Sequence, residues 1–387
     1  MLKSVNFFLM LLLAVLIPIA YTPNIYLDHS LYMLFSNGIT LLLGLIFGFT
    51  FFDCNILQKT KLPNLLKRLT GILSIIGVEF LIFYAGGLNY NLQDLISLVA
   101  VVVALYVGYA NNFSEKQIKG LIVVFCLFSI VLGYLSIDTY VGDFSVYVDD
   151  YLVKGKNQVG QLLALSVFLS FYISFFEKKN VYRFLLYIVV VISFFFLLVI
   201  KCKTAIVATF VALCVVFYKL SHRNVRQKVF FMGISIVLII GLFFYDNILS
   251  NVLDIVGLSG KSSMEEISTG RASRNDMAIE YIFSNPIFGE LEHYSHIPQI
   301  HNWILLRVVA FGLVFSLPFL VFYVYILFYS GKRMLKSKKW EIANLGFLLM
   351  LLPYISSMAE PEAPFAPNTV YTLHYLLLGI AIRNDYT

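Results

Sequence analysis

The sequence predicts an all-α membrane protein with about twelve transmembrane helices. Of its 387 residues, 60% are hydrophobic and only 13% are charged, a balance that soluble globular domains do not have. The apolar residues are also gathered in long runs, such as 184–200 and 229–245, which hold no charge. Each run is close to the length of about 20 residues that crosses the core of a bilayer.

The expected spans follow one another with short polar connections, except for one long polar interval late in the chain. In order they are 5–21, 31–52, 69–88, 95–110, 119–137, 157–176, 184–200, 204–218, 229–245, 303–329, 341–358 and 370–382. Only Lys3 precedes the first apolar run, and no small-residue cleavage site follows it. We therefore expect a retained first span rather than a cleaved signal peptide.

These spans divide the chain into three regions: spans one to nine in 1–245, a large outer loop in 246–302, and spans ten to twelve in 303–387. The loop is too short for an independent domain. Apolar residues at helical spacing in 248–256 predict a helix lying in the membrane interface. A second helix is predicted from Gly270 to about Ser284, because a proline follows directly after Asn285.

The orientation follows from the basic residues, most of which fall in alternate connections. These are Lys3, Lys59, Lys61, Lys67, Arg68, Lys116, Lys119, Lys178, Lys179, Arg183, Lys219, Arg223, Arg226, Lys228, Lys332, Arg333, Lys336, Lys338, Lys339 and Arg383. Cytoplasmic loops carry the excess of lysine and arginine. We therefore expect both termini in the cytoplasm and the loop 246–302 outside.

The remaining basic residues lie at outer loops or near outer span ends, against this bias. They are Lys154, Lys156, Lys201, Lys203, Lys261, Arg271, Arg274 and Arg307. Outer loops tolerate single lysines, but most of this set occurs as close pairs. A forked guanidinium suits phosphate, so the set indicates a site for an anion on the outer face.

Two further positions belong to this interpretation. Asn157 is expected to be the N-cap of the sixth span, and a helix N-terminus just after lysines suits an anion. Glu79 lies inside the third span and should face the interior of the bundle, because a carboxylate is costly in lipid. Arg307, one turn inside the tenth span, could either reach the outer site or pair with Glu79.

The sequence has no Gly-rich phosphate loop and no dinucleotide fingerprint, so no cofactor is expected. No metal is expected either, because Asp149 and Asp150 alone are a weak metal signal. The cysteines have no metal-ligand spacing and are expected to be small core residues.

His301, where the long loop meets the tenth span, can act as a general base on a hydroxyl. A lipid-linked diphosphate sugar would use both the basic residues and this histidine, and it carries its own activation energy.

Several motifs resemble the O-antigen polymerase and O-antigen ligase superfamily (Wzy-type and WaaL-type proteins). They are Gly270-Arg271, then Asn285-Pro286-Ile287-Phe288-Gly289, then His301-Asn302 with Leu305, together with Lys203-Thr204 and Lys156-Asn157 at span ends. The resemblance covers nearly the whole chain in order and topology. Lys203 stands where that family usually has arginine.

The resemblance implies a bundle similar to GT-C glycosyltransferases and an inverting, metal-independent glycosyl transfer. The reaction would polymerise undecaprenyl-diphosphate-linked repeat units into O-antigen or capsule polysaccharide, on the outer face of the bacterial plasma (inner) membrane. His301 and Arg271 would be catalytic. The substrate-binding residues would be Arg274, Lys203, Lys156, Asn157, Asn302 and Arg307.

Two other functions remain open at this point. An O-antigen ligase would differ only in its acceptor, a lipid A core. A flippase or transporter would also show many spans and a basic outer cavity, but it would place polar residues at midplane depth in several spans. The expected partners are the lipid-linked oligosaccharide, membrane lipid and a chain-length regulator protein, and nucleic acid is not expected.

Overall fold

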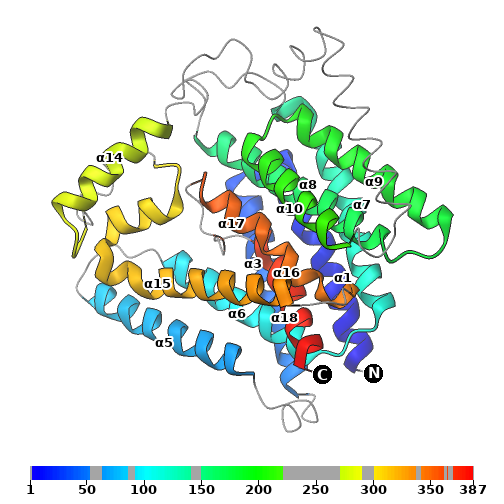
Figure 1. Cartoon of the computed structure of the whole chain (residues 1–387), viewed down its shortest axis with the longest axis horizontal. Coiled ribbons are helices and arrows are strands. Elements are labelled where there is room, and N and C mark those ends of the chain that lie inside the picture. Colours follow the sequence, from blue (N-terminus) through cyan, green and yellow to red (C-terminus); the bar gives the residue numbers. More distant parts are fainter. Residues whose placement is uncertain are drawn as a thin grey trace.

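The computed structural model describes residues 2–52, 63–85, 92–140, 150–220, 271–289, 300–336, 341–360, 364 and 369–386. All regular structure in this part of the chain is helical (Figure 1). The helices are α1 (Leu2–Ala20), α2 (Pro23–Tyr26), α3 (His29–Phe52), α5 (Asn64–Ala85), α6 (Leu92–Ala110), α7 (Glu115–Tyr140), α8 (Asp150–Ser174), α9 (Asn180–Val199), α10 (Lys203–Leu220), α14 (Arg271–Ser284), α15 (Trp303–Lys336), η2 (Ile342–Asn344), α16 (Leu345–Leu349), α17 (Leu351–Ser357), η3 (Thr369–Tyr371) and α18 (Thr372–Tyr386).

The predicted all-α class is therefore confirmed. Most predicted spans fall on one helix each, whereas 229–245 lies outside the described residues. The prediction of one continuous helix over 341–358 is wrong, because this stretch is divided into η2, α16 and α17, and 370–382 begins in η3 and continues in α18. Within the described part, four helices are long and apolar enough to cross a membrane, namely α3, α7, α9 and α15, and shorter apolar helices accompany them. The number of crossings stays a prediction.

The two ends of the chain lie at the same end of the bundle and are linked through polar contacts. Near the N-terminus, Asn6 donates a hydrogen bond to Thr50 at 3.2 Å, and Asn111 donates to the same hydroxyl at 3.0 Å. Near the C-terminus, Arg383 donates to the carbonyl oxygen of Tyr109, also at 3.0 Å. This placement agrees with an even number of crossings.

α15 is broken at Gly312, where the backbone takes a left-handed φ of 66°. The rings of Trp303 and Tyr323 stack with centroids 5.8 Å apart, although a straight helix would hold these residues about 30 Å apart. Residues 303–311 therefore fold back beside the long remainder, 313–336 (Figure 1). The prediction of one continuous span over 303–329 is wrong in this respect.

The break is stabilised by the turn that follows α14. The amides of Leu313 and Val314 lack helical partners after the break, and they donate to the carbonyl oxygens of Pro286 (2.9 Å) and Ile287 (3.3 Å). A Cβ on Gly312 would lie 2.1 Å from the Ile287 oxygen. The backbone of 286–289 therefore acts as a cap for the long segment of α15.

α14 confirms the second helix predicted in the outer loop, whereas the stretch 248–256 lies outside the described residues. Its buried face packs on the folded-back segment through a small core of Ala278, Ile300 and Val309. α14 and residues 300–311 thus form one layer over the bundle. This layer carries Arg271, Arg274 and His301.

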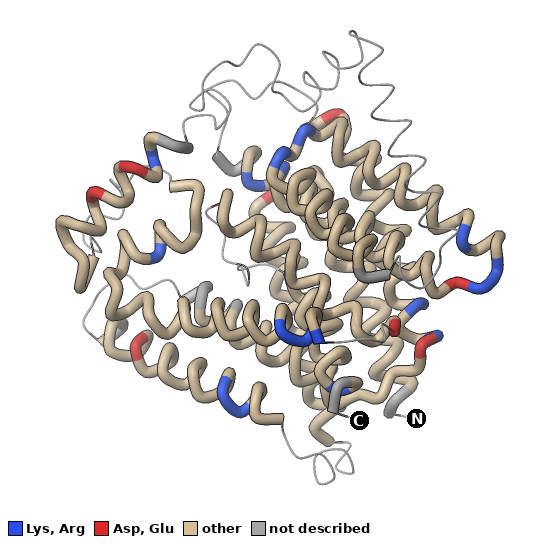
Figure 2. The backbone as a smooth tube through the Cα atoms, in the orientation of Figure 1, with Lys and Arg blue, Asp and Glu red and all other residues tan. Residues whose placement is uncertain are grey.

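The basic residues gather at opposite sides of the bundle (Figure 2). One group surrounds the starts of α8 and α10, and another lies where α7 and α9 begin. In the second group Lys119 contacts Glu177, which lies in the turn between α8 and α9. In the sequence, the first of these two groups was assigned to the outer connections and the second to the cytoplasmic ones. The structure keeps the two groups apart.

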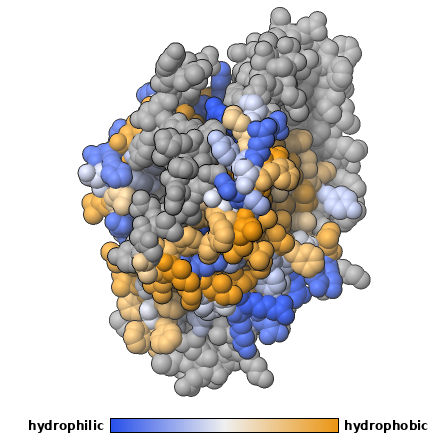
Figure 3. Space-filling model, turned by 90° about the vertical axis from the view of Figure 1, so that its left-hand side faces the viewer, coloured by the Kyte–Doolittle hydropathy of each residue, from blue (hydrophilic) through white to orange (hydrophobic). Residues whose placement is uncertain are grey.

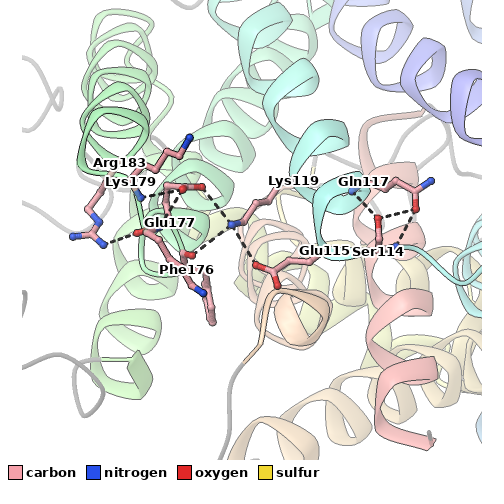
Figure 4. A network of polar contacts seen from close by, with 9 residues as sticks. Ser114, Glu115, Gln117, Lys119, Phe176, Glu177, Lys179 and Arg183 are labelled. Atoms are coloured by element: carbon pink, nitrogen blue, oxygen red, sulfur yellow. Dashed lines mark hydrogen bonds and ion pairs between the residues drawn. The ribbon is translucent and has the colours of Figure 1, made fainter.

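Glu177 is the centre of this second group (Figure 4). Its carboxylate accepts hydrogen bonds from the backbone amides of Lys178 (3.0 Å) and Lys179 (3.3 Å) and from the ammonium of Lys119 (3.3 Å). Burial acts to raise the pKa of Glu177, but these hydrogen bonds and the charge of Lys119 outweigh it and lower that pKa. The carboxylate therefore favours folding most when it is ionised.

The Glu177→Gln variant is expected to lose about 1 kcal/mol of stability at pH 7, because a neutral amide cannot accept these bonds as strongly. A lowered folded-state pKa gives stability that is present above the ordinary carboxyl pKa of 4.5 and is lost as the pH falls through the folded-state value. The difference in Tm between wild type and variant should therefore shrink on acidification below pH 4.5. Glu115→Gln is the matched control, because Glu115 pairs with the same Lys119 but its side chain is 63% exposed. Equal losses in both variants would contradict the prediction.

Candidate functional site

Glu360, just beyond α17, is the centre of the candidate site. It is only 1% exposed. One carboxylate oxygen accepts a hydrogen bond from the Thr204 hydroxyl at 2.6 Å, and the other accepts one from the Asn157 amide at 2.9 Å. A buried carboxylate requires such partners. These bonds tie together the start of α10, the outer part of α8 and the end of α17.

His301 is the third residue near this carboxylate. Its Nδ1 atom lies 3.8 Å from Oε2 of Glu360, and its side chain is 15% exposed. The next residue, Asn302, caps α15, since its side-chain oxygen accepts from the amides of Ile304 (3.0 Å) and Leu305 (3.2 Å). The cap fixes the backbone next to His301. The predicted substrate-binding residue Asn302 therefore has a structural task in this fold.

Asn157 is not the N-cap of its helix, because α8 begins at Asp150. The expectation of a cap at this position is wrong. Its side chain instead bridges Glu360 and Cys202, whose thiol lies 3.6 Å from the Asn157 side-chain oxygen. The thiol donates to the side-chain oxygen of Asn157, whose nitrogen donates to Glu360, and these two contacts orient the amide beside the carboxylate.

The predicted lysines flank these polar residues. Lys156 and Lys203 are the chain neighbours of Asn157 and Thr204, and both are half-buried. Between α9 and α10, Lys201 takes a left-handed φ of 53°, which is unfavourable for a lysine. This turn brings α10 directly beside the outer part of α8. The structure therefore places the two predicted lysine pairs around one site.

The predicted arginines divide into two groups. Arg271 is the first residue of α14, and Arg274 lies one turn later and is half-buried. Their helix packs on residues 300–311 through Ala278, Ile300 and Val309. Arg307 is different, because it is buried at the break in α15.

The guanidinium of Arg307 lies between two aromatic rings, 3.7 Å from the Phe311 centroid and 3.8 Å from that of Phe319. It also interacts electrostatically with Glu79 on α5. Because Phe311 and Phe319 lie on opposite sides of the break, Arg307 clamps the folded-back segment. These contacts favour the alternative in which Arg307 pairs with Glu79 over direct contact with substrate.

A polar branch leads from the site along α8. Gln161, one turn after Asn157, accepts a hydrogen bond from the Tyr371 hydroxyl at 2.5 Å. The His374 ring lies edge-on to Tyr371 at 5.3 Å. Asn157 and Gln161 therefore turn one face of α8 toward polar partners inside the protein.

Sequence reasoning did not assign Glu360, Thr204 or Cys202 to the site. Glu360 lies in the connection between the predicted spans 341–358 and 370–382, and Thr204 was named only as part of a resemblance. Cys202 and Cys126 are buried core residues as predicted, whereas Cys214 is exposed. The available signal was position, since Glu360 follows the predicted span 341–358 and Thr204 begins the predicted span 204–218.

In the part of the chain that the structure describes, no three His, Cys, Asp or Glu residues are grouped to hold a metal ion. No protein-family model matches the chain, and a search of curated proteins found no similar sequence. The functional argument therefore rests on the residues and their geometry.

Proposed function

We propose that the protein is a glycosyltransferase that extends a lipid-linked glycan on the outer face of the bacterial plasma membrane. The observation that supports this most is the convergence of His301, Glu360, Asn157 and Thr204, with Lys156 and Lys203 as the chain neighbours of the last two. A histidine close to a buried carboxylate, beside cationic residues, suits a reaction that removes a proton and releases an anion.

In the proposed reaction, an acceptor hydroxyl oxygen attacks the anomeric carbon of a polyprenyl-diphosphate-linked sugar. The new glycosidic bond forms as the bond from the anomeric carbon to the diphosphate oxygen breaks, with inversion. Nε2 of His301 takes the hydroxyl proton, and the diphosphate leaves with the bonding electron pair. The cations stabilise this leaving group more than the intact donor, because its charge increases as the bond breaks.

Glu360 acts in this scheme as a positioning residue. Its carboxylate lies on the Nδ1 side of the His301 ring, which leaves Nε2 for the acceptor. Asn157 and Thr204 hold the carboxylate from two helices, so the orientation of the base depends on α8 and α10 as well as on α15.

The test is an assay with purified protein and a synthetic polyprenyl-diphosphate oligosaccharide. Products of two or more repeat units support the polymerase. Transfer that occurs only when a lipid A core is added would identify a ligase. Movement of the lipid-linked glycan across a vesicle membrane, with no new glycosidic bond, would identify a flippase and overturn the proposal.

The two arginines of α14 are expected to differ. If Arg271 grips the diphosphate, Arg271→Lys should lower kcat/KM at least tenfold, because a point charge replaces the planar fork, a loss of roughly 1.5–3 kcal/mol. Arg274→Lys is the matched control one turn later and should have a milder effect. Full polymer formation by Arg271→Ala at normal protein level would instead indicate that Arg271 is a salt-bridge residue.

The proposed orientation places α14 outside and both chain ends in the cytoplasm. In intact cells, a membrane-impermeant thiol reagent should label Asp276→Cys, an exposed position on α14. Lys178→Cys, exposed between α8 and α9, should be labelled only after permeabilisation. The reverse pattern would remove the functional proposal together with the orientation.

A further inference from the structure

The turn after α14 carries large apolar side chains that the protein leaves uncovered. Phe283 is 80% exposed, Phe288 65% and Ile287 54%. Ile279, one turn before Phe283, is 42% exposed. We call Ile279, Phe283, Ile287 and Phe288 the α14 edge. Such residues are costly in water when they lie side by side.

The α14 edge continues a longer apolar stripe on α15. Leu313, Val314, Leu317, Val321, Val324 and Phe328 recur at helical spacing along the long segment, and each is 43–68% exposed. On a helix long and apolar enough to cross a membrane, such a stripe faces lipid. Figure 3 shows an apolar band on this side of the molecule, with hydrophilic residues above and below it.

The two apolar surfaces are held at one level by direct contacts. The ring centroid of Phe288 lies 6.1 Å from that of Phe315, and the Pro286 carbonyl accepts the amide hydrogen of Leu313. Ile287 and Phe288 therefore lie beside the first turn of the long segment of α15. Asp276 and Glu280, at the helical positions opposite the buried Ala278, are exposed.

We infer that the α14 edge is inserted in the outer leaflet of the membrane, at the boundary between headgroups and acyl chains. The partner of this surface is bilayer lipid, because the edge extends the lipid-facing stripe of α15 without a break. Ile279 and Phe283 lie beside Asp276 and Glu280 on the exposed side of α14, away from the buried Ala278. A mixture of apolar and acidic side chains on one surface suits the boundary between headgroups and acyl chains better than the acyl interior. This inference is independent of the proposed reaction.

Insertion would give the α14 edge a mechanical role. The edge is joined through Gly289 and Gly312 to the break in α15, and α14 is packed on residues 300–311. The depth of the edge in the leaflet therefore sets the height of the layer that carries His301. A change in lipid thickness would act on this layer through the edge.

The experiment uses the full chain in nanodiscs and introduced tryptophans, read as the difference from wild type. The quencher is phosphatidylcholine with bromine at defined acyl depths. Phe283→Trp and Phe288→Trp should be quenched as strongly as Leu317→Trp, with the maximum for bromines nearest the headgroup. Lys178→Trp, exposed in the turn between α8 and α9 and outside the predicted spans, is the control and should be quenched far less.

Two outcomes would overturn the inference. Quenching of Phe283→Trp and Phe288→Trp no stronger than that of Lys178→Trp would place the edge outside the bilayer. Weak quenching combined with cross-links between Phe288→Cys residues of two copies would assign the edge to an interface between protein molecules. All variants change exposed side chains, so their folding is checked by Tm against wild type.

Discussion

His301→Ala is expected to reduce glycosyl transfer by about 10²–10⁴-fold, the usual contribution of a positioned general base. The loss should appear in kcat, because the imidazole acts on the acceptor hydroxyl during the chemical step. Binding of the lipid-linked donor should change little, since the cationic residues that would hold the diphosphate are intact. The measurement is turnover of a synthetic lipid-linked donor by purified variant protein, with donor binding measured separately.

Three further variants test whether the effect is specific to His301 and depends on Glu360. His293→Ala and His296→Ala alter histidines of the same loop, outside the described residues, and should retain most activity. Glu360→Gln should lower kcat by about 10²-fold with a smaller change in KM, because a displaced base loses its alignment. Near wild-type turnover by His301→Ala would remove the general-base role. A parallel loss of abundance and activity would make His301 a structural residue.

Gly312→Ala should produce the largest loss of stability, about 2–4 kcal/mol or more. The residue has a φ of 66°, and an added Cβ would lie 2.1 Å from the Ile287 oxygen, a backbone atom that cannot move aside without breaking the cap. Relief of the clash requires the folded-back segment to separate from the turn after α14. His301 would lose its place beside Glu360 as a result.

The same helix offers a matched control for this variant. Gly331 also lies in α15, but nothing stands within 4 Å of a Cβ built there. Gly331→Ala should be neutral or slightly stabilising, by up to about 1 kcal/mol, since alanine is the better helix former. The readout is Tm of the purified proteins together with the yield of folded material. Equal Tm values for the two variants would show that the break does not depend on glycine at position 312.

The helices could be predicted from the sequence, because runs of apolar residues report membrane-length helices directly. The break at Gly312 could not, since hydropathy depends on side chains and the break depends on backbone dihedral angles and on carbonyl oxygens of a distant turn. The same limit explains why Trp303 and Arg307 were expected in the first turns of a straight span. Their true neighbours, Tyr323 and Phe319, lie beyond the break.

The site was predicted in part. His301, Lys156, Asn157 and Lys203 were named from residue type and position, and the structure gathers them. The partner that organises them, Glu360, lies far along the chain from Asn157 and Thr204, and no local spacing connects it to either. For Asn157 the local preference for helix caps was misleading, because α8 begins earlier, at Asp150, and the buried carboxylate of Glu360, beyond α17, accepts from its amide instead.

The cap on the break in α15 also has a consequence for how the chain enters the membrane. A helix interrupted inside an apolar segment exposes amide groups that lipid cannot satisfy. Synthesis runs from the N-terminus, so the carbonyl groups of Pro286 and Ile287 exist before Leu313 and Val314 leave the ribosome. The acceptors are thus in place when the donors arrive. Circular permutation could move this turn to the C-terminal side of α15, so that the donor amides would be synthesised before the acceptor carbonyls. The interrupted helix would then stay in the bilayer with unpaired amides until the turn was made.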